Sequence, residues 1–201
     1  MRRIVLLRHG ETTGNSGSRY HGSSDLDLSP EGREQMRLAA TKLRWEGFDL
    51  VASSPLRRAW RSAWIVAEGR PVRLLGDLRE IHFGRWEGLS REEIEACDPV
   101  LFEDWQKGAP GFEYPGGEKR AEFRARVERG LVEIGRSPGH SALVIGHKGV
   151  IRTICEILTG GKPPADLPAL GESIELTLEP DGSWFLGRRS SNPPGLEVGA
   201  A

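Results

Sequence analysis

Two histidines in this sequence directly follow short apolar segments. His9 comes after Ile4–Leu7 and is preceded by Arg8, and His147 comes after Ala142–Ile145 and a glycine. Short runs of β-branched and aliphatic residues are typical of buried strands. Ligands bind in open α/β sheets beyond the carboxyl ends of such strands. The spacing therefore predicts that the two histidines can meet at one edge of a sheet.

A third predicted strand end adds positive charge. The segment Ser53–Ala59 follows an apolar run at Phe48–Ala52 and contains Arg57 and Arg58. Arginine and the free backbone N–H groups at the start of a helix are a natural site for an oxyanion. Phosphoryl transfer depends mainly on positioning and charge stabilisation. Each strand end alone is weak evidence, but the three together favour a phosphate pocket.

Five motifs, in order along the chain, resemble those of the histidine phosphatase (phosphoglycerate-mutase-like) superfamily. They are LLRHGETTGN, RYHGSSDLDLSPEGREQ, SSPLRRAWRSA, LREIHFGRWEG and GHKGVIRTI, and they extend over about three quarters of the chain. The resemblance implies a metal-independent phosphomonoester hydrolase of the small-molecule branch. Such an enzyme needs no cofactor, acts on a small phosphorylated metabolite, and forms a phosphohistidine.

The resemblance also implies roles for individual residues. His9 would attack phosphorus as neutral imidazole, with its other ring nitrogen held by a backbone carbonyl near Gly10–Thr13. Glu80 would protonate the leaving alkoxide and then accept a proton from water, which requires a raised pKa. The catalytic set implied is His9, Glu80, Arg8, Arg58 and His147. The phosphate- and substrate-binding set is Arg8, Asn15, His21, Gly22, Arg58 and His147.

Several positions depart from the family pattern, and two of them bear most directly on substrate binding. Lys148 stands where many relatives have glycine, so it either adds a cation to the pocket or points outward. His82 occupies a position that is often acidic in phosphatases, which leaves substrate contacts there open. A metal-binding role for His82 is disfavoured, because no paired histidine accompanies it.

Strands alternate with helices along the chain, which predicts a three-layer α/β sandwich with helices on both faces of the sheet. The central sheet is expected to be mostly parallel, with an antiparallel edge. The predicted strands are Ile4–Leu7, Phe48–Ala52, Val72–Leu75, Ala142–Ile145, and a hairpin of Ser173–Leu178 with Ser183–Leu186. The predicted helices begin near Ser29, Pro55, Arg91, Glu118 and Val150. We expect residues 1–190 to form a single domain and residues 191–201 a loose tail.

The composition narrows the possible partners. The chain has 201 residues and a formal net charge of −1, which gives no support for a nucleic-acid or membrane partner. Its N-terminal apolar run is too short for a signal peptide. Cys97 and Cys155 lack zinc-ligand spacing and are expected to be buried thiols in a reducing cytoplasm. A homodimer would be unsurprising, because exposed sheet edges need to be covered.

Two alternative functions stay open. Cofactor-dependent phosphoglycerate mutases have similar motifs, but this chain lacks the tyrosine-, asparagine- and lysine-bearing continuation that marks them after LREIHFGRWEG. A non-catalytic phospholigand-binding module would be expected to lose His9 or Glu80, and both are present. The sequence therefore favours water as the final phosphoryl acceptor, and leaves the identity of the phosphomonoester open.

Overall fold

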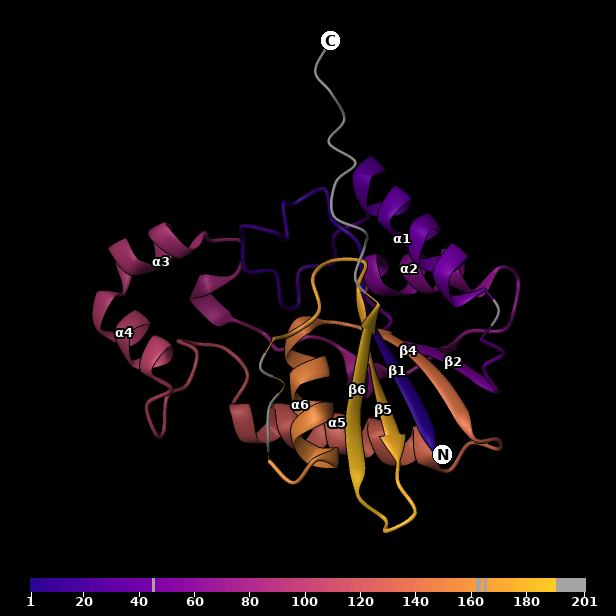
Figure 1. Ribbon diagram of the computed structural model, residues 1–201. Helices are drawn as coiled ribbons and strands as arrows, with labels where there is room; N and C mark the ends of the chain where they lie inside the picture. Colours follow the sequence, from indigo (N-terminus) through magenta and orange to yellow (C-terminus); the bar gives the residue numbers. More distant parts are fainter. Residues whose placement is uncertain (45, 162–163, 165, 191–201) are drawn as a thin grey trace.

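A central sheet organises the molecule (Figure 1). The structure, a computed structural model, describes residues 1–44, 46–161, 164 and 166–190, so the predicted tail at 191–201 lies outside the described residues. The described strands are β1 (Arg3–Arg8), β2 (Leu50–Ser53), β3 (Arg73–Leu74), β4 (Ser141–Gly146), β5 (Ser173–Leu178) and β6 (Trp184–Ser190). Their order is β3-β2-β4-β1-β5-β6.

The pairing of the strands confirms the predicted sheet. Strands β1, β2, β3 and β4 are parallel, whereas β5 pairs antiparallel with both β1 and β6. The register of β1 on β4 places Arg8 beside Gly146, and Ser53 of β2 pairs with Ile145. The carboxyl ends of three adjacent strands therefore lie level at one edge of the sheet, and His9 and His147 directly follow two of them.

Helices cover both faces of the sheet, as predicted (Figure 1). Helices α1 (Pro30–Leu43) and α2 (Arg57–Ala67) cover one face, and α5 (Arg120–Gly135) and α6 (Lys148–Leu158) cover the other. Alternate residues of β1 serve the two faces, so Val5 packs toward the α1–α2 side and Leu6 toward the α5–α6 side. Because both faces of the sheet are covered, the central strands have continuous apolar sequences instead of alternating apolar and polar residues.

The start of α1 follows the predicted capping pattern. The Ser29 hydroxyl accepts a hydrogen bond from the Gly32 amide, at 3.0 Å, and Pro30 occupies the first helical position. Gly32 also allows the helix to approach the loop after β1. A Cβ on Gly10 would lie 2.4 Å from the Gly32 carbonyl oxygen, so side chains are excluded at this contact.

A second, smaller core lies away from the sheet. It joins the 3₁₀ turn η2 (Gly84–Trp86) to helices α3 (Arg91–Cys97) and α4 (Pro99–Lys107) through Trp86, Ile94, Phe102 and Phe112. We refer to these four residues as the satellite core. Figure 1 shows α3 and α4 standing apart from the sheet, beside the loop that follows β1. Helix α4 was not predicted from the sequence.

Several boundaries and one burial assignment differ from the sequence predictions. Strand β6 continues to Ser190, beyond the predicted Leu186, and α5 begins at Arg120. Cys155 is buried as expected, but Cys97 is exposed, so the prediction of two buried thiols was wrong for Cys97. It is the last residue of α3, and its thiol donates to the Ile94 carbonyl oxygen at 3.5 Å. None of the described helices combines the length and apolar composition needed to cross a membrane.

Candidate active site

His9 is buried at the end of β1, and its tautomer is fixed by its neighbour. Its Nδ1 lies 2.7 Å from the Gly10 carbonyl oxygen, which can only accept a hydrogen bond, so Nδ1 carries the proton. Burial, and then the positive charges of Arg58 and Arg8, hold the pKa of His9 well below its usual value. The resting imidazole is therefore neutral, with a bare Nε2, which is the state a nucleophile requires.

His147 packs against His9 with its own polar atoms unpaired. The two ring centroids are 5.2 Å apart and the ring planes meet at 60°. Both ring nitrogens of His147 are buried without a hydrogen-bond partner. An unsatisfied buried polar group costs about 1–3 kcal/mol, so such a group in a native protein needs an explanation. An incoming anion would supply the missing acceptor.

Arg58 enters the site from the first turn of α2 and is fully buried. Its Nη1 donates to the Ser24 carbonyl at 2.6 Å, and its Nη2 donates to the carbonyls of Gly22 and His21 at 2.6 and 3.1 Å. These bonds join α2 to the loop that follows β1 and hold the guanidinium in one orientation. Its Nε is buried without a partner.

Arg8 lies at the last position of β1, next to His9. Its Nη1 donates to the Pro168 carbonyl at 3.3 Å, and its Nε is buried without a partner. Arg8 and Arg58 each lower the pKa of His147, after the larger effect of burial. The unpartnered nitrogens of Arg8, Arg58 and His147 thus form a set of polar groups near His9, with the positive charge on the two guanidinium groups.

Glu80 lies in the segment between β3 and η2, and its side chain reaches the start of α6. Its Oε2 accepts a hydrogen bond from the Gly149 amide at 2.9 Å, and its Oε1 accepts one from the Ile81 amide at 3.0 Å. Burial raises the pKa of Glu80, although the two amides and the arginines Arg58 and Arg8 oppose the shift. A carboxyl group with a raised pKa, beside the cations of this site, is suited to proton transfer.

Comparison with known proteins gives this arrangement a family. The model of the histidine phosphatase superfamily (branch 1) matches residues 4–178. This chain belongs to that superfamily. It is similar to glucosyl-3-phosphoglycerate phosphatase of Mycobacterium tuberculosis, with 36% identity over 85% of this chain and 80% of the relative. Phosphoserine phosphatase 1 of Hydrogenobacter thermophilus is 33% identical over 79% of this chain and 77% of the relative.

The solved structures agree with the sequence relatives. A putative α-ribazole-5′-phosphate phosphatase from Escherichia coli superimposes with a TM-score of 0.83 and 28% identity, and the match covers 98% of this chain and 99% of that chain. The relatives are small-molecule phosphatases, and members of the family act through a phosphohistidine intermediate. The chain is accordingly a phosphatase of the histidine phosphatase superfamily.

The other predicted binding residues of this histidine phosphatase lie in the loop after β1. Gly22 is buried and offers its carbonyl to Arg58, and a Cβ there would lie 1.8 Å from the Ile81 carbonyl oxygen. His21 donates from Nε2 to the Gly14 carbonyl at 2.6 Å, so its ring closes the loop on itself. Asn15 is exposed, at a turn with φ of 58°. Contact of these three residues with substrate stays a prediction.

Lys148 and His82 lie at more open positions. Lys148 begins α6 directly after His147, and its side chain is exposed. Desolvation, and then repulsion from Arg8 and Arg152, lower the pKa of Lys148. His82 is exposed, and its Nδ1 accepts a hydrogen bond from the Gly84 amide. In the described part of the chain, no group of three or more His, Cys, Asp or Glu side chains could hold a metal ion.

Glu87 is a residue of the site that the sequence analysis missed. Its carboxylate accepts hydrogen bonds from the amides of Gly22, Ser23 and Phe83 and from the Ser24 hydroxyl. Burial alone would raise the pKa of Glu87, but these bonds outweigh it and lower the pKa. The same loop residues receive Arg58 on their carbonyl oxygens, so Glu87 and Arg58 hold the loop from both sides. The sequence signal that could have identified this residue is the glutamate of the GRWEG motif, which is Glu87 itself.

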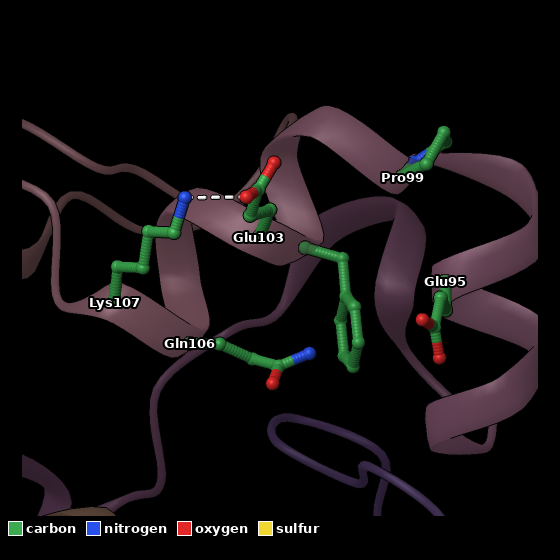
Figure 2. Close-up of a pocket in the computed structure, with 6 residues that line it drawn as sticks. Glu95, Pro99, Glu103, Gln106 and Lys107 are labelled. Atoms are coloured by element: carbon green, nitrogen blue, oxygen red, sulfur yellow. Dashed lines mark hydrogen bonds and ion pairs between the residues drawn. The ribbon is translucent and has the colours of Figure 1, made fainter.

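A surface pocket of about 420 Å³ lies between α3 and α4, away from the predicted site residues. Figure 2 shows Glu95, Pro99, Glu103, Gln106 and Lys107 around it, with Lys107 paired to Glu103. Its lining contains neither of the paired histidines nor the arginines that surround them. This pocket is therefore separate from the histidines and arginines at the sheet edge.

Proposed function

We propose that this histidine phosphatase hydrolyses small phosphomonoesters through a phosphohistidine on His9, without a metal ion or other cofactor. The observation that carries the proposal is the pairing of a neutral His9, bare at Nε2, with unpartnered donors on Arg8, Arg58 and His147. Preorganised donors of this kind stabilise the charge that develops on phosphoryl oxygens during transfer.

The proposed reaction has two steps. In the first, Nε2 of His9 forms a bond to phosphorus while the bond from phosphorus to the ester oxygen breaks, and Glu80 gives its proton to the departing alkoxide. In the second, Glu80 takes a proton from water, the water oxygen bonds to phosphorus, and the phosphorus–nitrogen bond breaks. Phosphate leaves, and both His9 and Glu80 return to their starting states. A bound phosphoryl anion would raise the pKa of Glu80 further and favour its acid form.

The substrate is proposed to be a small phosphorylated metabolite. The names of the relatives include phosphatases of glucosyl-3-phosphoglycerate and of phosphoserine, and both of those esters carry a carboxylate as well as a phosphate. Lys148, exposed beside Arg8, is a suitable partner for such a second negative charge. We therefore place carboxylate-bearing phosphomonoesters first in the set to be tested, with a ribazole phosphate as the comparison without a carboxylate.

The deciding experiment is phosphate release from p-nitrophenyl phosphate and from this set of esters in EDTA, with wild type and His9→Ala side by side. Release by wild type that His9→Ala lacks, together with a phosphorylated wild-type protein trapped by rapid quenching, supports the proposal. Activity that disappears with EDTA and returns with a divalent metal contradicts metal independence. Turnover that persists in His9→Ala contradicts the assignment of the nucleophile.

The same assay separates the alternatives. Transfer of phosphate between positions of phosphoglycerate, in the presence of a bisphosphate cofactor, would identify a mutase, and ligand binding without release would identify a binding module. We also propose a cytoplasmic location, which the free thiols Cys97 and Cys155 support. The homodimer expected from the exposed sheet edges stays a prediction, as does the absence of a nucleic-acid partner. Sedimentation analysis and a nucleic-acid binding assay test these two points.

A further inference from the structure

Arg126 of α5 reaches out of its helix to the segment that carries Glu80. Its Nη1 donates to the carbonyl oxygens of Asp77 and Arg79, at 3.0 and 2.5 Å. Its Nη2 donates to the carbonyl oxygen of Glu80 itself, at 3.0 Å. One side chain thus binds three backbone carbonyls within four consecutive residues, of which the last is the proposed general acid.

The remaining donors of Arg126 bind Glu118. Nε of Arg126 donates to Oε1 of Glu118 at 2.6 Å, and Nη2 donates to Oε2 at 2.7 Å, so the two side chains form a bidentate ion pair. The two side chains are only 15% and 19% exposed, so solvent screens this pair less than a surface pair. The Glu118 amide also donates to the His82 carbonyl at 2.9 Å. Glu118 therefore ties Arg126 to the chain just beyond Glu80.

A guanidinium has five N–H donors, and these contacts use five acceptors. Arg126 consequently has no donor left for a phosphate, unlike Arg8 and Arg58. Its acceptors also explain why an arginine is needed. The segment between β3 and η2 contains only the short 3₁₀ turn η1 (Gly76–Leu78), so its carbonyls have few partners within a sheet or helix.

We propose that Arg126 is the positioning residue of the general acid: by binding the carbonyls of residues 77, 79 and 80, it sets where the Glu80 carboxyl group meets the leaving oxygen. The inference rests on the proposed function, in which Glu80 protonates that oxygen. It assigns to Arg126 no contact with substrate. Displacing the backbone of Glu80 by a fraction of an ångström weakens proton transfer more than it weakens phosphate binding.

The leaving group distinguishes this role from general structural support. p-Nitrophenolate departs readily without a proton, whereas a simple alkoxide needs one. A misplaced acid therefore lowers kcat/KM for an alkyl phosphate much more than for p-nitrophenyl phosphate. A loosened phosphate pocket, or a partly unfolded protein, lowers both values alike. The value of kcat/KM depends only on the steps up to and including the first phosphoryl transfer. The later hydrolysis of phosphohistidine therefore does not mask the difference.

The test compares kcat/KM for the two esters in wild type, Arg126→Ala, Arg126→Lys and Arg129→Ala. Arg126→Ala is expected to lose about 10- to 100-fold with the alkyl ester and less than about 3-fold with p-nitrophenyl phosphate. The loss is smaller than the roughly 100- to 10,000-fold that a general acid contributes, because the carboxyl group is displaced and not removed. Arg126→Lys is expected to recover little, since an ammonium lacks the planar fork. Arg129 lies on the same helix as Arg126, and Arg129→Ala removes only an exposed contact with the Asp77 side chain. This control variant is expected to match wild type.

Two further variants keep the result interpretable. If Arg126→Ala does not fold, Glu118→Gln takes its place, because it removes one charge of the pair and leaves Arg126 present. It should show the same selectivity to a smaller degree. Glu80→Gln serves as the reference for a lost acid. Selectivity in Glu80→Gln without selectivity in the Arg126 and Glu118 variants overturns this inference alone. Equal loss with both esters in Glu80→Gln contradicts the proposed role of Glu80.

Discussion

The Glu80 carboxylate and the Gly149 backbone are in direct contact: Oε2 accepts the Gly149 amide at 2.9 Å, and a Cβ at this position would lie 2.5 Å from Oε1. Gly149 lies in the first turn of α6, two residues after His147. The positive end of the helix dipole thus faces the buried carboxylate. This backbone amide thereby links the proposed acid to the helix that begins directly after His147, a proposed phosphate-binding residue.

The first prediction follows from this contact. Gly149→Ala should push the Glu80 carboxylate out of place and lower kcat/KM for alkyl phosphates by about 10- to 100-fold, which is part of the roughly 100- to 10,000-fold that a general acid contributes. Steady-state kinetics on the purified variant measure the effect. Gly146→Ala is the matched control, because its nearest non-local atom would be 3.8 Å from the new Cβ. Equal activity of the two variants would contradict the assignment.

The second prediction concerns stability and pH. Burial raises the pKa of Glu80 from 4.5, so above that pH the folded state holds a proton that the unfolded state has released. The wild-type protein therefore loses stability as pH rises from 4.5 through the folded pKa. Glu80→Gln resembles the protonated form and avoids this loss. Its Tm should exceed that of wild type by more at about pH 8 than at about pH 5, as calorimetry would measure, even though its activity falls.

The third prediction concerns the carboxylate that supports Arg58. Glu87→Ala removes the acceptor shared by Gly22, Ser23 and Ser24, and should let the loop and the Arg58 guanidinium move. We expect KM and the inhibition constant of inorganic phosphate to rise by about 10-fold, the equivalent of a hydrogen bond to a charged group. Inhibition assays measure both. An unchanged inhibition constant would mean that Arg58 keeps its orientation without Glu87.

Variants of the two adjacent arginines complete that test. Arg58 is fully buried, whereas the Arg57 side chain is 57% exposed and pairs with Asp25 at 3.6 Å. Arg58→Ala should therefore raise the inhibition constant of phosphate at least as much as Glu87→Ala. Arg57→Ala should change it little, because exposed ion pairs contribute about 0–1 kcal/mol. The reverse order would transfer the phosphate-binding role to Arg57.

The fourth prediction concerns the charge of the substrate. Lys148→Ala should raise KM for a carboxylate-bearing ester such as phosphoserine by about 2- to 5-fold, the equivalent of an exposed ion pair. KM for p-nitrophenyl phosphate should change by less. Measuring both esters at low and high salt adds a second readout, because screening weakens such a contact. An equal change for the two esters would show that Lys148 does not recognise the carboxylate.

The parts of the site that the sequence predicted depend on local chain geometry. His9 and His147 follow buried apolar runs, and level strand ends bring them together. The partner of Nδ1 was expected in the turn after His9, and it is the very next carbonyl, that of Gly10. Such contacts span few residues, so a motif carries nearly all the information that determines them.

The parts that the sequence did not reveal depend on contacts between distant segments. Glu87 binds residues more than sixty positions earlier, and Arg126 binds the Glu80 segment from another helix. Helix α4 is short, and Phe102 is its one fully buried residue. A helix of this length owes its stability to packing, here of Phe102 with Trp86 and its neighbours, rather than to a local pattern.

The satellite core has a consequence for how this enzyme can diverge. Its aromatic residues hold α3 and α4 together apart from the sheet, while His9 and His147, the proposed reacting and phosphate-binding groups, follow the strand ends. A substitution in α4 can therefore alter the surface beside the loop after β1 and leave His9 and His147 where they are. We therefore expect substitutions in α3 and α4 to be able to change which phosphomonoester is accepted without changing His9 or His147. A single set of reacting groups can in this way serve many metabolites.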